Sequence, residues 1–241
     1  MRYALISDVH GNLEALEAVI EALQKERVDE YLSTGDIIGY GADPSKCIER
    51  VRGLTEKVVC GNHEWAVRDL KYTDYFNPYA KAAVYWTRQM INTEELNYAN
   101  SLNHLLKEKD FTLVHGTLHR PEEFRYMRDE REALMSFRLQ DTPLCFLGHT
   151  HSPGIYWERE GRISYSQDKI VKLAEGTKYI INCGSIGQPR DGNPKASYCI
   201  YDDEAKKIEF KRIAYDIKKA QDKIRGAGLP DIIADRLAEG R

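Results

Sequence analysis

Gly61-Asn62-His63-Glu64 places an amide, an imidazole and a carboxylate directly behind a glycine. The preceding residues 56–60 (EKVVC) are predicted to form a short buried strand, so the three polar side chains leave its end together. Asn-His-Glu is also a good turn sequence, and the tetrapeptide alone favours neither a turn nor a site. The choice depends on what the other predicted strands carry at their ends.

Four other apolar runs end in the same kind of chemistry. Residues 3–6, 31–34, 111–114 and 144–147 are each predicted to form a buried strand. The segments that follow them are, in order, Ser7-Asp8-Val9-His10-Gly11-Asn12, Gly35-Asp36, His115-Gly116 and Gly148-His149-Thr150-His151. Five of the seven histidines (10, 63, 115, 149 and 151) therefore lie in these loops, often beside a glycine that lets the chain turn sharply.

These residue types suit the hydrolysis of a phosphoester by two metal ions. Two divalent ions about 3.5–4 Å apart lower the pKa of a bridging water, hold the phosphate oxygens and orient an in-line attack. Such a pair requires a bridging carboxylate and mixed imidazole and oxygen ligands. The candidate ligands are Asp8, His10, Asp36, Asn62, His115, His149 and His151. A set without thiolate suits Mn²⁺, which we favour, as well as Fe, Co²⁺, Ni²⁺ or Zn²⁺.

The length of 241 residues predicts one large α/β domain over the whole chain. Apolar residues at helical spacing from Leu13 to Leu23 predict a helix that Asn12 is placed to cap, and Asp43-Pro44 is predicted to open a second. The alternation of strands and helices implies a mainly parallel sheet, in which ligand sites lie beyond the carboxyl ends of the strands.

The later sequence predicts a second sheet that faces the first. Short strands are expected at 143–148, 154–159, 178–183, 197–202 and 207–213. Two helices are expected at 216–226 and 231–239, and their charges of alternating sign are typical of solvated surface. The predicted fold class is therefore α/β, a two-sheet β-sandwich flanked by helices.

Residues 66–109 interrupt this pattern. Asn77-Pro78 and Thr93-Glu94-Glu95 are each predicted to begin a helix, and most of the aromatic residues here are expected to pack in the core. Because the segment lies between two candidate ligand loops, we also expect a helical cap that covers the site and helps to select the substrate.

Composition and charge exclude several classes of protein. A net charge of −3 provides no overall positive field for a nucleic-acid backbone and leaves room only for a local basic patch. The cysteines are odd in number and several lie in strand-like runs, so we expect buried, reduced thiols in a cytoplasmic protein. The first predicted strand begins at Arg2, which leaves no room for a signal peptide, and no apolar run has the length of a membrane span.

The motif set resembles that of the calcineurin-like metallophosphoesterases. D-x-H (8–10), G-D (35–36), G-N-H-E (61–64), a lone histidine (115) and G-H-x-H (148–151) occur in the family's order. Residues 182–190 (NCGSIGQPR) match less specifically. The resemblance implies the family's two-sheet fold with flanking helices, and hydrolysis by metal-activated water without a covalent enzyme intermediate.

The resemblance also implies roles for single residues. The ligands of one ion would be Asp8, His10, Asp36 and His151, and those of the other Asp36, Asn62, His115 and His149. Asp36 is then the catalytic bridge, and His63 would hydrogen-bond the phosphate and protonate the leaving oxygen. Asn12 resembles a phosphate contact of the family, although a helix cap is an equally good use for it. Glu64 would orient His63 or one of the ligands.

Departures from the family bear on the substrate. In Ser/Thr protein phosphatases the G-D motif continues into an Asp-Arg-Gly segment, and an arginine commonly precedes G-N-H-E. Here residues 37–39 are IIG and Cys60 precedes Gly61, so both arginines and the supporting acid are missing. We therefore expect a small phosphodiester or nucleotide substrate, as in the bacterial and archaeal phosphodiesterase-like branch, some of whose relatives cleave dinucleoside polyphosphates. A phosphomonoesterase similar to the Ser/Thr phosphatases is the alternative.

Arg190, within residues 188–192 (QPRDG), is a candidate to replace part of the missing positive charge, since its planar fork suits phosphate. A turn set by Pro189 and Gly192, with Arg190 solvated, explains the same residues equally well. The family fold also serves as a non-catalytic scaffold in the retromer complex, where the histidine of the G-N-H motif is missing. The presence of His63 and of the full candidate ligand set favours an enzyme.

Overall fold

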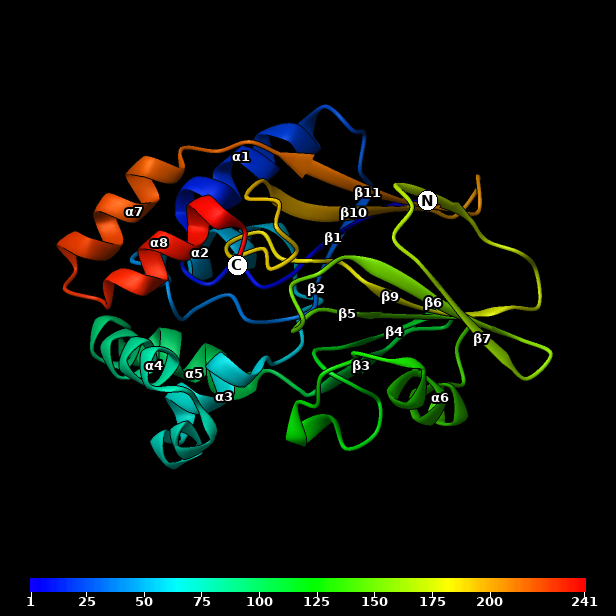
Figure 1. The fold of residues 1–241 in the computed structure, drawn as a ribbon, viewed down its shortest axis with the longest axis horizontal. Coiled ribbons are helices and arrows are strands. Elements are labelled where there is room, and N and C mark those ends of the chain that lie inside the picture. The colour runs from blue at the N-terminus through cyan, green and yellow to red at the C-terminus, as the bar shows by residue number, and fades with distance from the viewer.

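Two β-sheets face one another in the computed structural model, which describes all 241 residues (Figure 1). Helices flank both sheets, so the predicted two-sheet α/β fold is confirmed. The first sheet, in spatial order, contains β2 (Glu30–Ser33), β1 (Arg2–Ile6), β10 (Ala196–Asp202), β11 (Lys207–Ile213) and β8 (Ile170–Lys172). The second contains β3 (Leu105–Lys107), β4 (Phe111–Val114), β5 (Leu144–Leu147), β9 (Lys178–Asn182), β6 (Gly154–Arg159) and β7 (Arg162–Ser166).

Both sheets are mixed, and the expectation of a mainly parallel sheet is wrong. β1 pairs in parallel with β2, and β5 pairs in parallel with β4 and β9. All the other pairs are antiparallel. The strands that precede candidate ligand loops, β1, β2, β4 and β5, are nevertheless all in parallel pairs, so within each sheet their carboxyl ends point the same way.

The sequence pattern predicts that the strands after residue 143 form the second sheet, but β10 and β11 belong to the first sheet. β10 lies beside β1, with Leu5 opposite Cys199, whereas β4 belongs to the second sheet. Tyr198 and Ile200 of β10 lie in the apolar core beneath α1, while Cys199 and Tyr201 lie in the core between the sheets. A strand that is buried on both faces requires a central position, and pairing with β1 and β11 provides it.

Residues 56–60 form isolated bridges instead of the predicted strand. Ser33 pairs with Val58, and Val59 pairs with Asn103. The N–H of Cys60 then donates to the Asn103 carbonyl (2.8 Å), and the chain turns into α3 (Asn62–Arg68), so pairing stops after two residues.

Several helices begin where the sequence predicts. Asn12 Oδ1 accepts the N–H of Ala15 (3.1 Å) at the start of α1, and Pro44 is the first residue of α2. The helices outside the insertion are α1 (Leu13–Gln24), α2 (Pro44–Leu54), the 3₁₀ helix η2 (Pro121–Glu123), α6 (Glu130–Leu139), α7 (Ile217–Gly226) and α8 (Asp231–Glu239).

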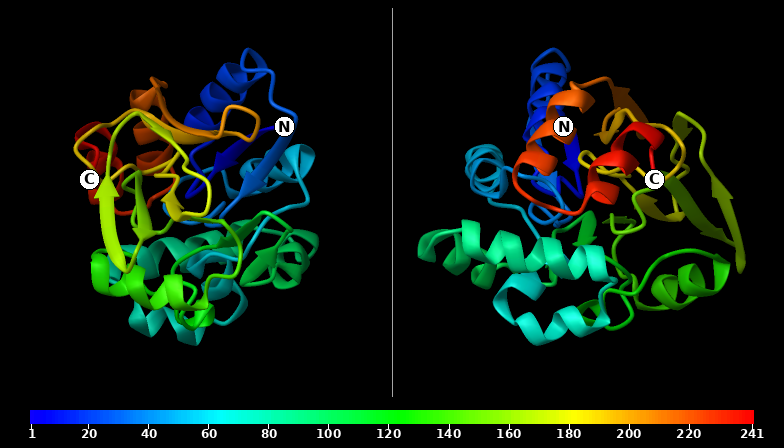
Figure 2. Two further views of the ribbon diagram at one scale, coloured as in Figure 1. Left: turned by 90° about the vertical axis from the view of Figure 1, so that its right-hand side faces the viewer. Right: turned by 60° about the vertical axis from the view of Figure 1, so that its left-hand side comes forward.

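The insertion at residues 66–109 is mainly helical and forms a layer along one side of the molecule (Figure 2). Its elements are the end of α3, the 3₁₀ helix η1 (Leu70–Tyr75), α4 (Pro78–Met90), α5 (Thr93–Ser101) and β3. Ala80 and Ala83 of α4 share an apolar cluster with residues of α7 and α8. The insertion is therefore packed against the C-terminal helices.

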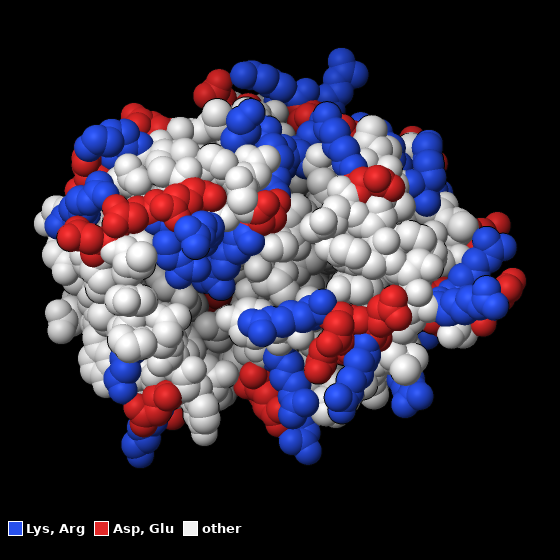
Figure 3. Space-filling model, viewed as in Figure 1, with Lys and Arg blue, Asp and Glu red and all other residues white.

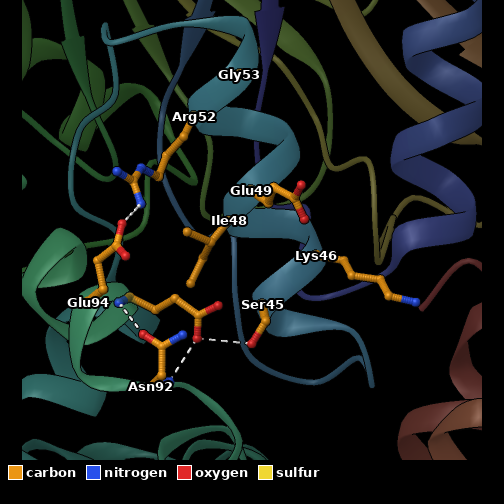
Figure 4. Close-up of a pocket in the computed structure, with 9 residues that line it drawn as sticks. Ser45, Lys46, Ile48, Glu49, Arg52, Gly53, Asn92 and Glu94 are labelled. Atoms are coloured by element: carbon orange, nitrogen blue, oxygen red, sulfur yellow. Dashed lines mark hydrogen bonds and ion pairs between the residues drawn. The ribbon is translucent and has the colours of Figure 1, made fainter.

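A cleft of about 500 Å³ lies between α2 and the start of α5 (Figure 4). Arg52 pairs with Glu94 across it (2.9 Å), and the Glu95 carboxylate accepts from Ser45 Oγ (3.0 Å) and from the Asn92 N–H (2.8 Å). Most of its polar groups therefore have partners within the fold, and the cleft connects the insertion to the main body.

The expectation of buried thiols is confirmed, since all five cysteines are buried and free. None of the helices combines the length and the apolar character that crossing a membrane requires.

Candidate metal centre

The seven candidate ligands converge in one place, although both sheets contribute them. Asp8 and His10 follow β1, Asp36 follows β2, His115 follows β4, and the last two histidines follow β5. Two groups have ligand atoms within 4.8 Å of one another: Asp8, His10, Asp36 and His151, and Asp36, His115 and His149. Asn62, at the start of α3, joins the second group because its Oδ1 lies 3.1 Å from His115 Nε2. Asp36 is common to both groups, and all seven residues are buried.

Five of these seven residues have a left-handed backbone, which is strained for side chains other than glycine. The φ angles are 50° at Asp8, 51° at His10, 54° at Asp36, 66° at His149 and 60° at His151. Neighbouring loops hold this conformation: the Asp8 N–H donates to the Gly35 carbonyl (3.0 Å) and the His10 N–H to the Asp36 carbonyl (2.9 Å). Strain gathered at one place is typical of functional sites.

Glu64 positions the loop of Asp36 and does not contact His63. One carboxylate oxygen accepts the N–H groups of Asp36 (2.8 Å) and Gly61 (2.9 Å). The other accepts those of Ile37 (2.8 Å) and Ile38 (3.2 Å). Burial and the nearby Asp36 charge raise the pKa of Glu64 to about 7, while the backbone donors favour its ionised form. Of the two roles left open by the sequence, the contacts support the orientation of a ligand.

The histidines of the first group present lone pairs to one another. His10 Nδ1 lies 3.1 Å from the Ile38 carbonyl and His151 Nδ1 lies 2.5 Å from the Gln188 carbonyl, and a carbonyl can only accept. Burial lowers the pKa of both histidines, so each is neutral and carries its proton on Nδ1. Their Nε2 atoms, 3.1 Å apart, are then both acceptors. Two facing lone pairs repel unless a cation lies between them, so this arrangement fits a metal ion.

In the second group, too, an imidazole nitrogen faces other candidate ligand atoms. His115 Nδ1 lies 2.7 Å from the Thr34 carbonyl, so its Nε2 faces His149 Nδ1 (3.0 Å) and Asp36 Oδ2 (3.2 Å). Burial opposes protonation of His115, but Asp36 and Asp8 outweigh it and raise its pKa to about 9. The negative field that favours a proton here also favours a metal cation. Nitrogen and oxygen donors without thiolate fit a divalent transition metal.

His63 belongs to neither group. Its ring lies 4.7 Å from the rings of His10 and Tyr40, and its buried Nδ1 has no hydrogen-bond partner. Burial lowers the pKa of His63 to about 4, although Asp36 opposes this. Gly39 has a φ of 89°, and a Cβ there would lie 2.0 Å from His63 Nδ1, so only glycine leaves room for the imidazole. A buried polar atom without a partner is available to a ligand.

A pocket of about 250 Å³ opens onto these groups, with largely aromatic walls. The residues that line it include Asn62, His63, His149 and the aromatic residues Tyr40, Tyr72, Tyr75, Phe76, Phe124 and Tyr126. Tyr126 stacks on His149, with ring centroids 3.9 Å apart. The sequence does not predict that Phe124 and Tyr126, which lie in irregular chain near η2, line this pocket. Their only sequence signal is that the segment follows the ligand candidate His115.

The two candidate substrate contacts have different surroundings. Asn12 uses both ends of its amide within the fold, since its oxygen caps α1 and its nitrogen donates to the Gly187 carbonyl (2.9 Å). Arg190 is half-buried and lies over the Tyr40 ring, with 5.8 Å between Cζ and the ring centroid. Its Nη2 donates to Gln188 Oε1 (2.8 Å), so Arg190 is held beside the pocket and is not a freely solvated turn residue.

The chain belongs to the calcineurin-like phosphoesterase superfamily, whose family model matches residues 1–206. It is 41% identical over 243 residues to an uncharacterized protein of Methanocaldococcus jannaschii, covering 99% of this chain and 98% of that one. A metallophosphoesterase structure from Sphaerobacter thermophilus is 42% identical with a TM-score of 0.87, covering 100% of this chain and 99% of that chain. Phosphodiesterase YfcE of Escherichia coli is 23% identical over 214 residues, covering 85% of this chain and 89% of that protein. These findings confirm the resemblance drawn from the motifs.

Proposed function

We propose that this protein is a phosphohydrolase that uses two divalent metal ions to hydrolyse a small phosphodiester or nucleotide. The observation that carries the proposal is the position of Asp36 Oδ2, 3.2 Å from His115 Nε2 in one ligand group and 3.6 Å from His10 Nε2 in the other. A carboxylate shared by two groups is the bridging ligand that a pair of ions requires. When bound, such ions supply a water of lowered pKa and neutralise the phosphate oxygens.

The proposed ligands divide as the two groups do. One ion would be held by Asp8, His10, Asp36 and His151, and the other by Asp36, Asn62, His115 and His149. Mn²⁺ is our favoured ion, and Fe, Co²⁺, Ni²⁺ or Zn²⁺ suit the same donors. The Nδ1 contacts with the carbonyls of Ile38, Gln188 and Thr34 support these roles, because they fix the tautomers of His10, His151 and His115.

His63 is the proposed proton donor to the leaving oxygen. Its pKa of about 4 makes it neutral near pH 7 in the free protein. An anionic phosphate beside the ring favours the imidazolium form, so His63 gains its proton when substrate binds. Its unpartnered Nδ1 and its place between His10 and the aromatic pocket support this role.

Replacing His63 by alanine is expected to lower metal-dependent hydrolysis by about 10²- to 10⁴-fold, the usual contribution of a general acid. The metal content is expected to stay unchanged, because His63 is in neither ligand group. The measurement is turnover by metal-stripped, Mn²⁺-reloaded protein of a model phosphodiester, a phosphomonoester and a dinucleoside polyphosphate, with metal analysis of each sample. His119→Ala, which changes a histidine outside the pocket, is the control.

The ranking of these three substrates separates a diesterase from a monoesterase and from a nucleotide hydrolase. Stoichiometric metal binding without turnover of any of them would contradict the proposal and favour a scaffold. Full activity of His63→Ala would leave the hydrolase intact but remove the role of His63.

The pocket supports a small substrate with an aromatic group. A volume of about 250 Å³ is small for a ligand site, and aromatic walls suit a nucleobase or an aryl ester. The E. coli relative is a phosphodiesterase by name, in keeping with this class of substrate.

We also propose that the chain is one domain over residues 1–241, with residues 66–109 as a cap over the site. Tyr72, Tyr75 and Phe76 of the cap line the pocket. The burial of Ala80 and Ala83 against the C-terminal helices supports a fixed cap.

Tyr75→Ala tests the role of the cap with little risk to folding, because Tyr75 is 84% exposed. Stacking on a base contributes about 1–3 kcal/mol, so KM for a nucleotide substrate is expected to rise by roughly five-fold or more. Tyr85→Ala, on α4 outside the pocket, is the matched control. Equal KM values for the two variants in steady-state kinetics would show that the cap does not select substrate through Tyr75.

A further inference from the structure

The C-terminal helix α8 lies against the site, although the family model ends at residue 206. Ile233, Ala234 and Leu237 share an apolar cluster with Tyr40, which lines the pocket. Ala80 and Ala83 of the cap helix α4 belong to the same cluster, and α8 lies next to α4 in Figure 1. α8 is therefore placed to contribute a side chain to the mouth of the pocket.

The end of α8 is tied to the loop that carries Arg190. The Gly192 N–H donates to the Gly240 carbonyl over 3.0 Å. Gly240 has a φ of 65°, and a Cβ there would lie 2.6 Å from the Asn193 nitrogen. This close approach fixes the position of α8 relative to Arg190.

Arg236 of α8 and Arg190 are both half-buried, and neither has an acidic partner. Their neighbours Arg225 and Arg241 pair with carboxylates, at 2.6 Å to Asp235 and 2.8 Å to Glu239. No carboxylate lies within 4.0 Å of the guanidinium of Arg190 or Arg236. Figure 3 shows Lys and Arg side chains gathered over the end of α8, beside a hollow in the surface.

The charge of Arg190 also affects the pKa of Arg236. Burial lowers the pKa of Arg236, the charge of Arg190 lowers it further, and Tyr40 opposes this. The Gly192–Gly240 hydrogen bond and the packing of α8 on Tyr40, over which Arg190 lies, bring the two arginines to the same partly dehydrated region, where no acid neutralises their repulsion. An anion with several oxygens relieves it, because the guanidinium fork matches phosphate oxygens.

Tyr40 lies beside Arg190 and beside two of the histidines. Its ring lies 4.7 Å from the rings of both His10 and His63, and the Arg190 guanidinium lies over the same ring at 5.8 Å. Arg190 and the two imidazoles are thus neighbours of one aromatic ring, and a substrate with two anionic groups is expected to extend from the arginines to the metal centre.

We infer that Arg190 and Arg236 form a second anion site, which holds an anionic group of the substrate other than the phosphate that is attacked. The inference rests on the proposed function and narrows its substrate class. The preferred substrates carry at least two phosphoryl groups, as a nucleoside diphosphate or a dinucleoside polyphosphate does.

The test compares inorganic phosphate with inorganic pyrophosphate by calorimetric titration of the full-length, Mn²⁺-loaded protein at a fixed concentration of free Mn²⁺. Arg236→Ala is expected to weaken pyrophosphate binding by about ten-fold or more and phosphate binding by less than about three-fold. Arg236→Met keeps the apolar stem and is expected to behave as Arg236→Ala does, whereas Arg236→Lys retains part of the preference. Arg190→Ala and the double variant complete a double-mutant cycle, in which non-additive losses are expected. Arg241→Ala, which removes an exposed arginine paired with Glu239, is the control.

Equal losses for the two ligands would overturn the inference, because the arginines would then hold the attacked phosphate. Unchanged binding of both ligands in Arg236→Ala and Arg236→Met would overturn it too, because Arg236 would be merely solvated. Failure of the proposed function gives a different result, namely no hydrolysis by the wild-type protein while the arginine-dependent preference for pyrophosphate persists.

Discussion

Asp36→Asn is expected to reduce metal-dependent hydrolysis by about a thousand-fold, the largest loss of any conservative substitution in this chain, since the charge at a bridging ligand is worth several kcal/mol. The asparagine keeps an oxygen for the His63 N–H, which Asp36 Oδ1 accepts at 2.9 Å, so the start of α3 is preserved. It loses the negative charge shared by the two ligand groups. The bound metal is therefore expected to fall from two ions to one or none, measured by elemental analysis after gel filtration.

The control for this experiment is Asp141→Asn, which removes an exposed carboxylate that is paired with Lys107 and belongs to neither ligand group. It is expected to retain both the metal and the activity. If Asp36→Asn held two ions and hydrolysed substrate at the wild-type rate, Asp36 would not be the bridge and the two-ion proposal would fall.

Glu64→Gln is expected to lower the free energy of unfolding by about 3 kcal/mol, although it changes one oxygen to an amide nitrogen. Both Glu64 oxygens accept backbone N–H groups, those of Asp36 and Gly61 on one side and of Ile37 and Ile38 on the other. Glutamine has a single acceptor oxygen, so its NH₂ group would face two buried donors. The midpoint of thermal unfolding is expected to fall by about 6–12 °C, and metal affinity with it, because the loop of Asp36 loses its support.

Glu94→Gln is the matched control for Glu64→Gln, because it alters an exposed glutamate whose side chain forms an ion pair with Arg52 alone. A surface ion pair of this kind contributes about 0–1 kcal/mol. Calorimetric unfolding of both variants gives the comparison directly. Equal unfolding temperatures would mean that the Glu64 hydrogen bonds are replaced without cost, and the positioning role would be wrong.

The convergence of the ligand candidates could be predicted from the sequence for a simple physical reason. Apolar runs such as 3–6 and 144–147 have to be buried, and each stops at a histidine or aspartate beside a glycine. Strands of this kind align their carboxyl ends when they pair in parallel, as β1 with β2 and β4 with β5 do. Local sequence therefore determines which side chains meet.

Which strands pair with one another could not be predicted from the sequence, because strand pairing depends on burial between distant parts of the chain. β10 is apolar on both faces, and only the packed fold shows that one face covers α1 and the other covers the second sheet. The same limit applies to α7 and α8, whose charges of alternating sign predict solvated surface. Arg225 and Arg241 fit that interpretation, but Arg236 is half-buried because the apolar side of α8 packs on Tyr40. Phe124 and Tyr126 reach the pocket from irregular chain, which carries no periodic signal.

The origin of the ligands in two different sheets has a mechanical consequence. Each of the two ligand groups combines residues that follow strands of both sheets, Asp8 and Asp36 with His151 in one and Asp36 with His115 and His149 in the other, so an ion in either group would cross-link the sandwich at one edge. Whatever binds only the folded form shifts the folding equilibrium toward it, and ions bound as proposed would also hold the two sheets together at this edge. Under the proposed function, loss of metal would therefore lower resistance to unfolding as well as activity.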